Sequence, residues 1–213
     1  MPKKIKNIIF DLDGTLIDSA PSILSGFKHV LNINGLEPLI PLTSSLIGPP
    51  LITTLGMVSG IDNKKKLQQM AEQFMSFYDI QGCFISQPYT AVDDGLNHLL
   101  DNGFKMHIAT NKRLIPTKNI LSHLGWDAFF YSVYTLDKAG ESFQSKSDMI
   151  AHQLKDLDLS KDHTIYVGDR TEDLQAAQNN QLNFIGVSWG YGDFPKDVTF
   201  IETFDQLGFL VTS

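Results

Sequence analysis

Apolar residues along the chain gather in five short clusters that are long enough to form buried strands. The clusters lie at about residues 5–10, 104–109, 129–134, 163–167 and 182–187. Segments with apolar residues at helical spacing separate most of them, at about 91–102, 116–124 and 171–180. Strands that alternate with helices in this way indicate a parallel sheet covered on both faces. The pattern therefore predicts an α/β fold.

The stretch at residues 18–87 breaks this alternation, because it contains no clear strand pattern. One helix is expected from Asp18 or Ser19 onwards and a second over about 63–80, with a Gly-Pro-Pro turn between them. Ligands bind at the carboxyl edge of open α/β sheets, which a helical insert after the first strand can cover. We predict a small α-helical cap domain at 18–87, inserted into a core domain of 1–17 and 88–213.

The composition is that of an ordinary globular protein, with 42% hydrophobic and 19% charged residues. A formal net charge of -7 and the lack of a long basic run argue against nucleic acid as a partner. The single cysteine, Cys83, cannot form an internal disulfide, which fits a reducing compartment. No apolar stretch is long enough for a signal peptide or a membrane span, so we expect a cytoplasmic protein with no membrane partner.

Chemically versatile side chains follow four of the predicted strands. In chain order they are Asp11 and Asp13, Thr110 and Asn111, Lys146, and Asp169 and Asp173. Because the carboxyl ends of parallel strands meet at one edge of a sheet, we expect these side chains to lie together. Each also has an ordinary explanation as a turn residue, a solvated charge or a helix cap, such as a capping box of Asp169 with Glu172.

The charges in this set favour a common site over the separate explanations. Ser145 is expected to cap a helix whose first residue is Lys146, where a cation opposes the helix dipole by roughly a few tenths of a kcal/mol. A lysine there is better explained as the countercharge to converging carboxylates. Several carboxylates cannot all ionise cheaply at short range, and oxygen ligands of this kind suit a hard divalent cation. We therefore predict a Mg²⁺ site.

Four motifs in this order resemble those of the haloacid dehalogenase superfamily: DLDGT at 11–15, Thr110 after an apolar strand, Lys146, and GDRTED at 168–173. The helical insert, TNK at 110–112 and IGVSWGYG at 185–192 are similar to the branch with phosphoglycolate phosphatases and sugar-phosphate phosphatases. The resemblance covers nearly the whole chain and is weakest in the insert. It implies a Rossmann-like α/β core with a helical cap domain.

The resemblance also implies a Mg²⁺-dependent phosphatase that hydrolyses a small phosphate monoester through an aspartyl-phosphate. Asp11 would be the nucleophile, and Asp13 would be the general acid and then the general base. The phosphate would be held by Thr110, Asn111 and Lys146. The metal would be bound by Asp11, the backbone carbonyl of Asp13, Asp169, and Asp173 directly or through a water. The partner would be a small phosphorylated metabolite, with phosphoglycolate, sugar phosphates and nucleoside monophosphates as candidates.

Two positions depart from the family pattern, although neither removes a reacting group. Ser147-Asp148 follows Lys146 where the family usually has prolines, and Asn180-Gln181 stands where Ala-Gly is common. A phosphomutase on the same fold remains an alternative, as does a phosphoacceptor signalling domain, which would not need the insert. Dehalogenation would need neither Mg²⁺ nor Asp13, and a silent binding protein would not need the full set of reacting groups. The sequence leaves open the roles of Arg113 and Arg170 and the choice between monomer and homodimer.

Overall fold

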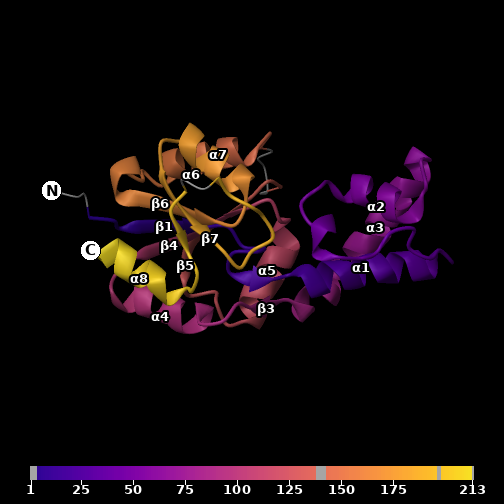
Figure 1. The fold of residues 1–213 in the computed structure, drawn as a ribbon, viewed down its shortest axis with the longest axis horizontal. Coiled ribbons are helices and arrows are strands. Elements are labelled where there is room, and N and C mark those ends of the chain that lie inside the picture. The colour runs from indigo at the N-terminus through magenta and orange to yellow at the C-terminus, as the bar shows by residue number, and fades with distance from the viewer. Residues whose placement is uncertain (1–3, 138–142, 196–197, 213) are drawn as a thin grey trace. The chain divides into compact units, whose positions relative to one another are not determined.

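A computed structural model describes residues 4–137, 143–195 and 198–212 (Figure 1). The chain divides into two compact units. The larger unit combines Met1–Asp18 with Pro88–Ser213, and the smaller unit is the continuous segment Ser19–Gln87. Two short strands, β2 (Ile17–Asp18) and β3 (Gln87–Pro88), pair where the chain passes from one unit to the other.

A six-stranded sheet forms the centre of the larger unit, with strand order β5-β4-β1-β6-β7-β8 and parallel pairing throughout. Its strands are β1 (Asn7–Phe10), β4 (Lys105–Thr110), β5 (Phe130–Thr135), β6 (Thr164–Gly168), β7 (Asn183–Val187) and β8 (Phe200–Ile201). The five strands predicted from the apolar clusters are confirmed. The sequence pattern missed β8, because two residues are too few to give a periodic signal.

The register of the sheet brings the ends of its central strands to the same level. Phe10 at the end of β1 lies opposite Ile108 of β4 and Val167 of β6. The backbone N–H of Asp11 continues this pairing by donating to the carbonyl of Val167 at 2.9 Å. The residues that directly follow these strands therefore emerge at one edge of the sheet.

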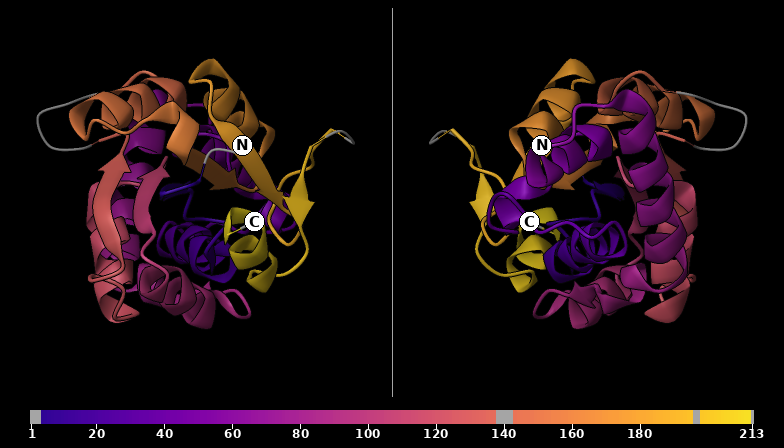
Figure 2. Two further views of the ribbon diagram at one scale, coloured as in Figure 1. Left: turned by 90° about the vertical axis from the view of Figure 1, so that its left-hand side faces the viewer. Right: turned by 90° about the vertical axis from the view of Figure 1, so that its right-hand side faces the viewer.

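Helices cover both faces of the sheet (Figure 1). The helices of this unit are α4 (Val92–Asp101), α5 (Leu114–His123), α6 (Lys146–Asp156), α7 (Thr171–Asn179) and α8 (Asp205–Thr212), with a 3₁₀ turn η3 (Lys161–His163). On one face α6 and α7 pack on a core that includes Ile9 and Tyr166. On the other, Phe10 stacks on Phe204 just before α8, with ring centroids 6.0 Å apart. The predicted Rossmann-like α/β fold is confirmed, and both views in Figure 2 show the curved layer of strands among its helices.

The smaller unit is helical, with α1 (Ala20–Ile33), α2 (Leu51–Ser59) and α3 (Lys64–Ile80) and the 3₁₀ turns η1 (Ser44–Leu46) and η2 (Gly82–Ile85). The first and third helices were predicted, and they pack through Phe27 and Phe74, whose ring centroids lie 5.1 Å apart. The interpretation of the segment after Gly48 as only a turn is wrong. Pro50 directly precedes α2, which buries Leu55 and Val58 and ends at Gly60 in the left-handed region.

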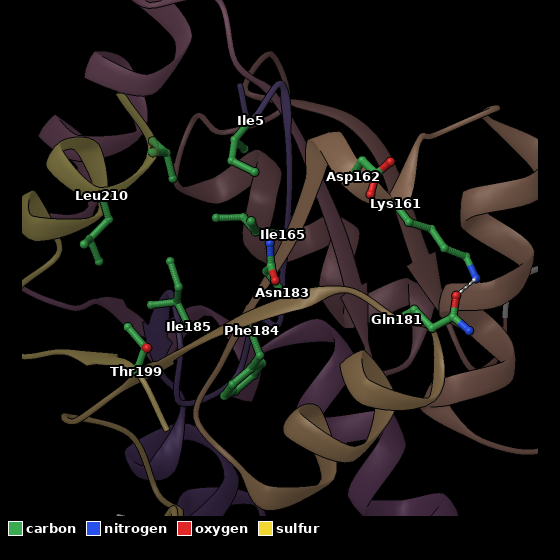
Figure 3. A pocket seen from close by; sticks show the side chains of 11 residues that line it. Ile5, Lys161, Asp162, Ile165, Gln181, Asn183, Phe184, Ile185, Thr199 and Leu210 are labelled. Carbon is green, nitrogen blue, oxygen red and sulfur yellow. Dashed lines mark hydrogen bonds between the residues drawn. The ribbon is translucent and has the colours of Figure 1, made fainter. Parts of the chain in front are cut away.

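A surface pocket of about 600 Å³ lies at the other edge of the sheet, where β1, β6 and β7 begin (Figure 3). Ile165 and Ile185 line it together with Leu210 of α8, and Lys161 and Gln181 stand at its rim. None of the side chains predicted to react lines this pocket. Among the described helices, none combines the length and apolar character needed to cross a membrane.

Candidate active site

Asp11 lies directly after the buried strand β1 and is itself only 5% exposed. Its Oδ2 lies 3.0 Å from Nζ of Lys146. Its Oδ1 is buried and accepts no hydrogen bond from any described residue. One oxygen of this carboxylate is therefore held by a cation, and the other is left to a group that the protein itself does not supply.

Lys146 occupies the first position of α6, as predicted, and Ser145 caps the helix by accepting a hydrogen bond from the backbone N–H of Asp148 at 3.1 Å. The Lys146 ammonium is buried and bridges Asp11 and Asp173, with Nζ 2.5 Å from Oδ1 of Asp173. Burial alone would lower the pKa of this lysine, but the two carboxylates outweigh that effect and raise its pKa above the usual value. The helix dipole is thus opposed by a cation that the carboxylates require.

The side chain of Asp173 is engaged on both oxygens. Oδ1 accepts from Lys146 and, at 3.3 Å, from the hydroxyl of Tyr166. Oδ2 accepts from the backbone N–H groups of Asp169 and Arg170, at 3.1 and 3.0 Å. The capping box of Asp169 with Glu172 is therefore wrong: Arg170 is the N-cap residue of α7, and Asp173 is the carboxylate that reaches back to it.

Asp169 is fully buried on the turn between β6 and α7. Its Oδ1 accepts from the hydroxyl of Thr15 at 3.4 Å, and its Oδ2 accepts from the backbone N–H of Tyr191 at 2.8 Å. Two glycines make room for it. A Cβ on Gly14, which has a φ of +83°, would lie 2.3 Å from Oδ2 of Asp169, and a Cβ on Gly190 would lie 2.2 Å from its Cβ.

The carboxylates crowd one another enough to change their titration. Burial, with the charges of Asp173 and Asp169 added and that of Lys146 opposing, raises the pKa of Asp11 to about 7. Burial and the charge of Asp173 likewise raise the pKa of Asp169 to about 6, against the Tyr191 amide, which lowers it. One lysine therefore does not neutralise the cluster.

The cluster fits a divalent cation. Asp11, Asp169 and Asp173 each offer an oxygen, and these oxygens lie within 4.8 Å of one another. Buried carboxylates in excess of nearby cations, together with the unpartnered Oδ1 of Asp11, form the hard oxygen donor set that Mg²⁺ prefers.

The structure does not bring the Asp13 side chain into this cluster. Both of its oxygens accept from Nζ of Lys112, at 2.9 and 3.0 Å. Lys112 is a residue that the sequence pattern missed as a candidate, although it belongs to the TNK stretch after β4. A lysine two positions beyond a buried strand, in a chain that needs countercharges at that edge, was the signal that could have identified it.

Thr110 and Asn111, the two predicted phosphate-binding residues at the end of β4, lie in different surroundings. Thr110 is 1% exposed, and its hydroxyl accepts from the backbone N–H of Lys112 at 3.2 Å. Asn111 is exposed, and its side chain donates to Glu172 at 3.0 Å rather than to the carboxylate cluster. Arg170 lies near the cluster, with Nε 4.0 Å from Oδ2 of Asp169.

The two departures from the family pattern contact each other. The side-chain amide of Asn180, at the end of α7, donates to the carbonyl of Ser147 at 2.9 Å. A second contact of that amide reaches the Ser147 hydroxyl at 3.4 Å. Ser147 directly follows Lys146, so this pair ties the first turn of α6 to the helix that carries Asp173. This contact holds the residue that follows Lys146, at the position where the family usually has prolines.

Comparison with known proteins places this geometry in a family. The model of the haloacid dehalogenase-like hydrolases matches residues 8–187, a span that includes every residue of the carboxylate cluster and Lys112. The chain belongs to this family. The resemblance drawn from the motifs is confirmed, and so is the expectation of a hydrolase.

Similar proteins within the family carry more than one activity in their names. The chain is 32% identical to the tyrosine-protein kinase PtkA of Mycobacterium tuberculosis, over 94% of this chain and 70% of that protein. It is also 32% identical to a phosphoglycolate phosphatase of Rhodobacter capsulatus, over 89% of this chain and 87% of that protein. The crystal structure of a predicted phosphatase from Clostridium acetobutylicum is 28% identical and superposes with a TM-score of 0.82, covering 98% and 99% of the two chains.

Proposed function

We propose that this haloacid dehalogenase-like hydrolase is a Mg²⁺-dependent phosphatase, which hydrolyses a small phosphate monoester through a phosphoryl group carried on Asp11. The observation that supports this most strongly is the state of the Asp11 carboxylate. It is buried, fixed by Lys146 through one oxygen, and without a hydrogen-bond partner at the other among the residues that the structure describes. A carboxylate held in this way loses little conformational freedom when it attacks phosphorus. Its burial has also removed most of its hydration, as a nucleophile requires.

The reaction requires two displacements at phosphorus. In the first, an oxygen of Asp11 forms a bond to phosphorus, the bond to the leaving oxygen breaks, and Asp13 gives that oxygen a proton. In the second, water gives a proton to Asp13 and attacks phosphorus, and the bond to Asp11 breaks. The products are an alcohol and inorganic phosphate, and both carboxyl groups return to their starting states. Lys146 and Thr110 lie at the edge of the sheet where they would hold the phosphoryl oxygens.

Asp11, Asp169 and the backbone carbonyl of Asp13 would hold the Mg²⁺. When bound, the ion would neutralise the carboxylate cluster and the charge on the phosphoryl group. Each oxygen of the Asp173 carboxylate already accepts two hydrogen bonds, Oδ1 from Lys146 and Tyr166 and Oδ2 from two backbone N–H groups. We therefore assign Asp173 contact with the metal through a water rather than directly, and a main role in holding Lys146.

The helical unit Ser19–Gln87 is proposed to be the cap domain that selects the leaving group. It contains four full cations, Lys28 and the run Lys64–Lys66, and no arginine. Lys66 already donates to Asn34 at 2.6 Å. A carboxylate-bearing substrate such as phosphoglycolate prefers a well-placed cation, so sugar phosphates and nucleoside monophosphates stand beside it as candidates.

A panel of phosphate monoesters, assayed for phosphate release with Mg²⁺ and with excess chelator, tests the proposal. We expect release that requires the metal and that Asp11→Asn abolishes. Glu202→Gln, at an exposed carboxylate, is the matched control and should retain full activity. Release in excess chelator, or substantial turnover by Asp11→Asn, would contradict the proposal. Conversion of one phosphate ester into another without release would instead identify a phosphomutase.

The similarity to PtkA favours one second candidate, phosphoryl transfer from ATP to a tyrosine hydroxyl. The two candidates differ in the final acceptor, which is water for a phosphatase and a tyrosine side chain for a kinase. Incubation with γ-labelled ATP and a tyrosine-containing protein distinguishes them. We expect no label on tyrosine, whereas label on tyrosine that requires Asp11 would favour the kinase.

A further inference from the structure

We propose that Lys112 is the positioning residue for Asp13, which it holds in the orientation needed for proton transfer. The inference rests on the phosphatase function proposed above. It assigns a role to a side chain for which the sequence motifs provide none.

The contact between the two side chains is close on both oxygens. Nζ of Lys112 lies 2.9 Å from Oδ1 of Asp13 and 3.0 Å from its Oδ2. A single hydrogen bond would let the carboxylate rotate about it, whereas contact with both oxygens fixes the plane of the group. The side chains are 5% exposed for Lys112 and 20% exposed for Asp13, so water competes little for the pair but can still reach the acid.

The ammonium is positioned by the sheet and not by the loop that carries Asp13. Lys112 lies two residues beyond the end of β4, and its backbone N–H is anchored to the hydroxyl of Thr110 at 3.2 Å. Strand β4 pairs in register with β1, which leads into Asp13. Burying an ammonium is costly unless it is paired, and the Asp13 carboxylate is a partner that Lys112 contacts through both oxygens. The acid is thus fixed from the neighbouring strand, 99 residues away in sequence.

The two-oxygen contact stabilises the charged form of Asp13, which is the base of the second displacement; in the first, one oxygen carries the proton and Lys112 would hold the other. Asp13 must direct one oxygen first at the leaving group and then at the attacking water, while the rest of its carboxylate keeps its place. After the first proton transfer Asp13 carries a negative charge beside a phosphorylated Asp11. The Lys112 ammonium balances that charge without itself giving up a proton.

The competing interpretation is that Lys112 binds the phosphoryl group of the substrate and touches Asp13 only incidentally. The two roles differ in their dependence on the leaving group. A residue that binds the phosphoryl group affects every phosphate ester to a similar degree. A residue that acts through Asp13 matters for alkyl esters, whose leaving oxygen needs a proton, and little for an activated aryl ester, which leaves without one.

The test compares Lys112→Met and Lys112→Arg with the wild type on two substrates, 4-nitrophenyl phosphate and the alkyl phosphate that the wild type hydrolyses best. For Lys112→Met we expect kcat for the alkyl ester to fall by about 10–100-fold, and the first-turnover rate with the aryl ester to fall by less than about threefold. Lys112→Arg should recover part of the alkyl activity. Lys105→Met, at an exposed lysine at the start of the same strand, is the matched control and should behave as wild type.

A double-mutant cycle with Asp13→Asn completes the test. If Lys112 acts through Asp13, adding Lys112→Met to Asp13→Asn should cause no further loss on the alkyl ester. Equal losses on both substrates, or fully additive losses in the cycle, would overturn the proposal. Thermal unfolding and circular dichroism check that each variant is folded, and Lys112→Gln replaces Lys112→Met if the latter is not.

The two proposals fail in different ways. A wild type that hydrolyses neither ester would refute the phosphatase function, and the role of Lys112 with it. A wild type that hydrolyses both, beside a Lys112→Met variant with an undiminished rate on the alkyl ester, would refute the role of Lys112 alone.

Discussion

Replacing Asp11 by asparagine should stabilise the metal-free protein at alkaline pH, and the same change should abolish turnover. Asp11 binds its proton more tightly in the folded protein, where its pKa is about 7, than in the unfolded chain, where it is 3.8. Between about pH 4 and 7 the folded state therefore holds more protons than the unfolded state. The contribution of Asp11 to the free energy of unfolding therefore falls as the pH rises through this window, because the folded state is forced to charge a buried group.

The size of the effect follows from the same shift. A rise in pKa from 3.8 to about 7 corresponds to at most about 4 kcal/mol, at about 1.4 kcal/mol per unit. Asparagine removes this penalty but also one partner of Lys146, which keeps Asp173 at 2.5 Å. We therefore expect Asp11→Asn to gain about 1–3 kcal/mol over the wild type at pH 8 in chelator, and close to nothing at pH 4.

Urea denaturation at pH 4, 5, 6, 7 and 8 in excess chelator measures this difference, with Glu202→Gln as the control at an exposed carboxylate. The readout is the difference between the two proteins: the stability of Asp11→Asn should match that of the wild type at pH 4 and exceed it by about 1–3 kcal/mol at pH 8. Added Mg²⁺ should stabilise the wild type most above pH 7, where the cluster is ionised. Parallel curves for the two proteins, or a destabilised Asp11→Asn at pH 8, would show that the carboxylates are not in electrostatic conflict.

Three further predictions concern other parts of the core unit. Asp13→Asn should give a burst of 4-nitrophenol followed by a stall with phosphate trapped on Asp11, seen by rapid quench; no trapped phosphate would show that Asp13 is not the base that activates water. Gly190→Ala should weaken Mg²⁺ binding, measured by calorimetry, because the new Cβ would lie 2.6 Å from the carbonyl of Gly14 and 2.2 Å from Cβ of Asp169; unchanged affinity would refute the steric argument. Burial, with Lys105 adding to it, lowers the pKa of His107 from 6.5 to about 4, so the neutral ring contributes stability that is present above pH 6.5 and is lost, by about 3 kcal/mol, towards pH 4. This contribution opposes that of Asp11, so the readout in urea denaturation is the difference in unfolding free energy between the wild type and His107→Gln, which should change by about that amount between pH 7 and pH 4; a constant difference would contradict it.

The sequence predicts the sheet well because its strands are rich in apolar residues, and the central strands β1 and β6 are buried at every position. The apolar pattern does not reveal elements that are very short or that begin directly after a turn signal. Strand β8 has two residues, and α2 begins directly after two prolines, where a turn is the stronger local signal. Tertiary packing decides both: Ile201 and Leu55 are buried, and neither segment has a periodic pattern long enough to reveal it.

Within the candidate site, the side chains that follow strands could be predicted, and their pairings could not. The strand ends bring Asp11, Lys146 and Asp169 to one edge because the sheet is parallel. Nothing in the sequence shows that the Asp13 side chain turns to Lys112, or that Asn180 reaches Ser147 across 33 positions. Such contacts depend on side-chain directions in three dimensions, which spacing along the chain does not encode.

The order of synthesis matters for a strand in the middle of the sheet. Strand β1 leaves the ribosome first, yet its two neighbours come much later, and Asn7 pairs in register with Lys105 on one side and Thr164 on the other. In the sequence, the helical unit lies between β1 and its two partner strands as one continuous segment. It can fold on its local contacts before the partners of β1 have been synthesised. The proposed metal site includes Asp169, whose Oδ2 accepts a hydrogen bond from the backbone N–H of Tyr191, so we expect that this site cannot form before residue 191 has been synthesised. The order of synthesis would thus delay the proposed reaction until the sheet around the carboxylates is complete.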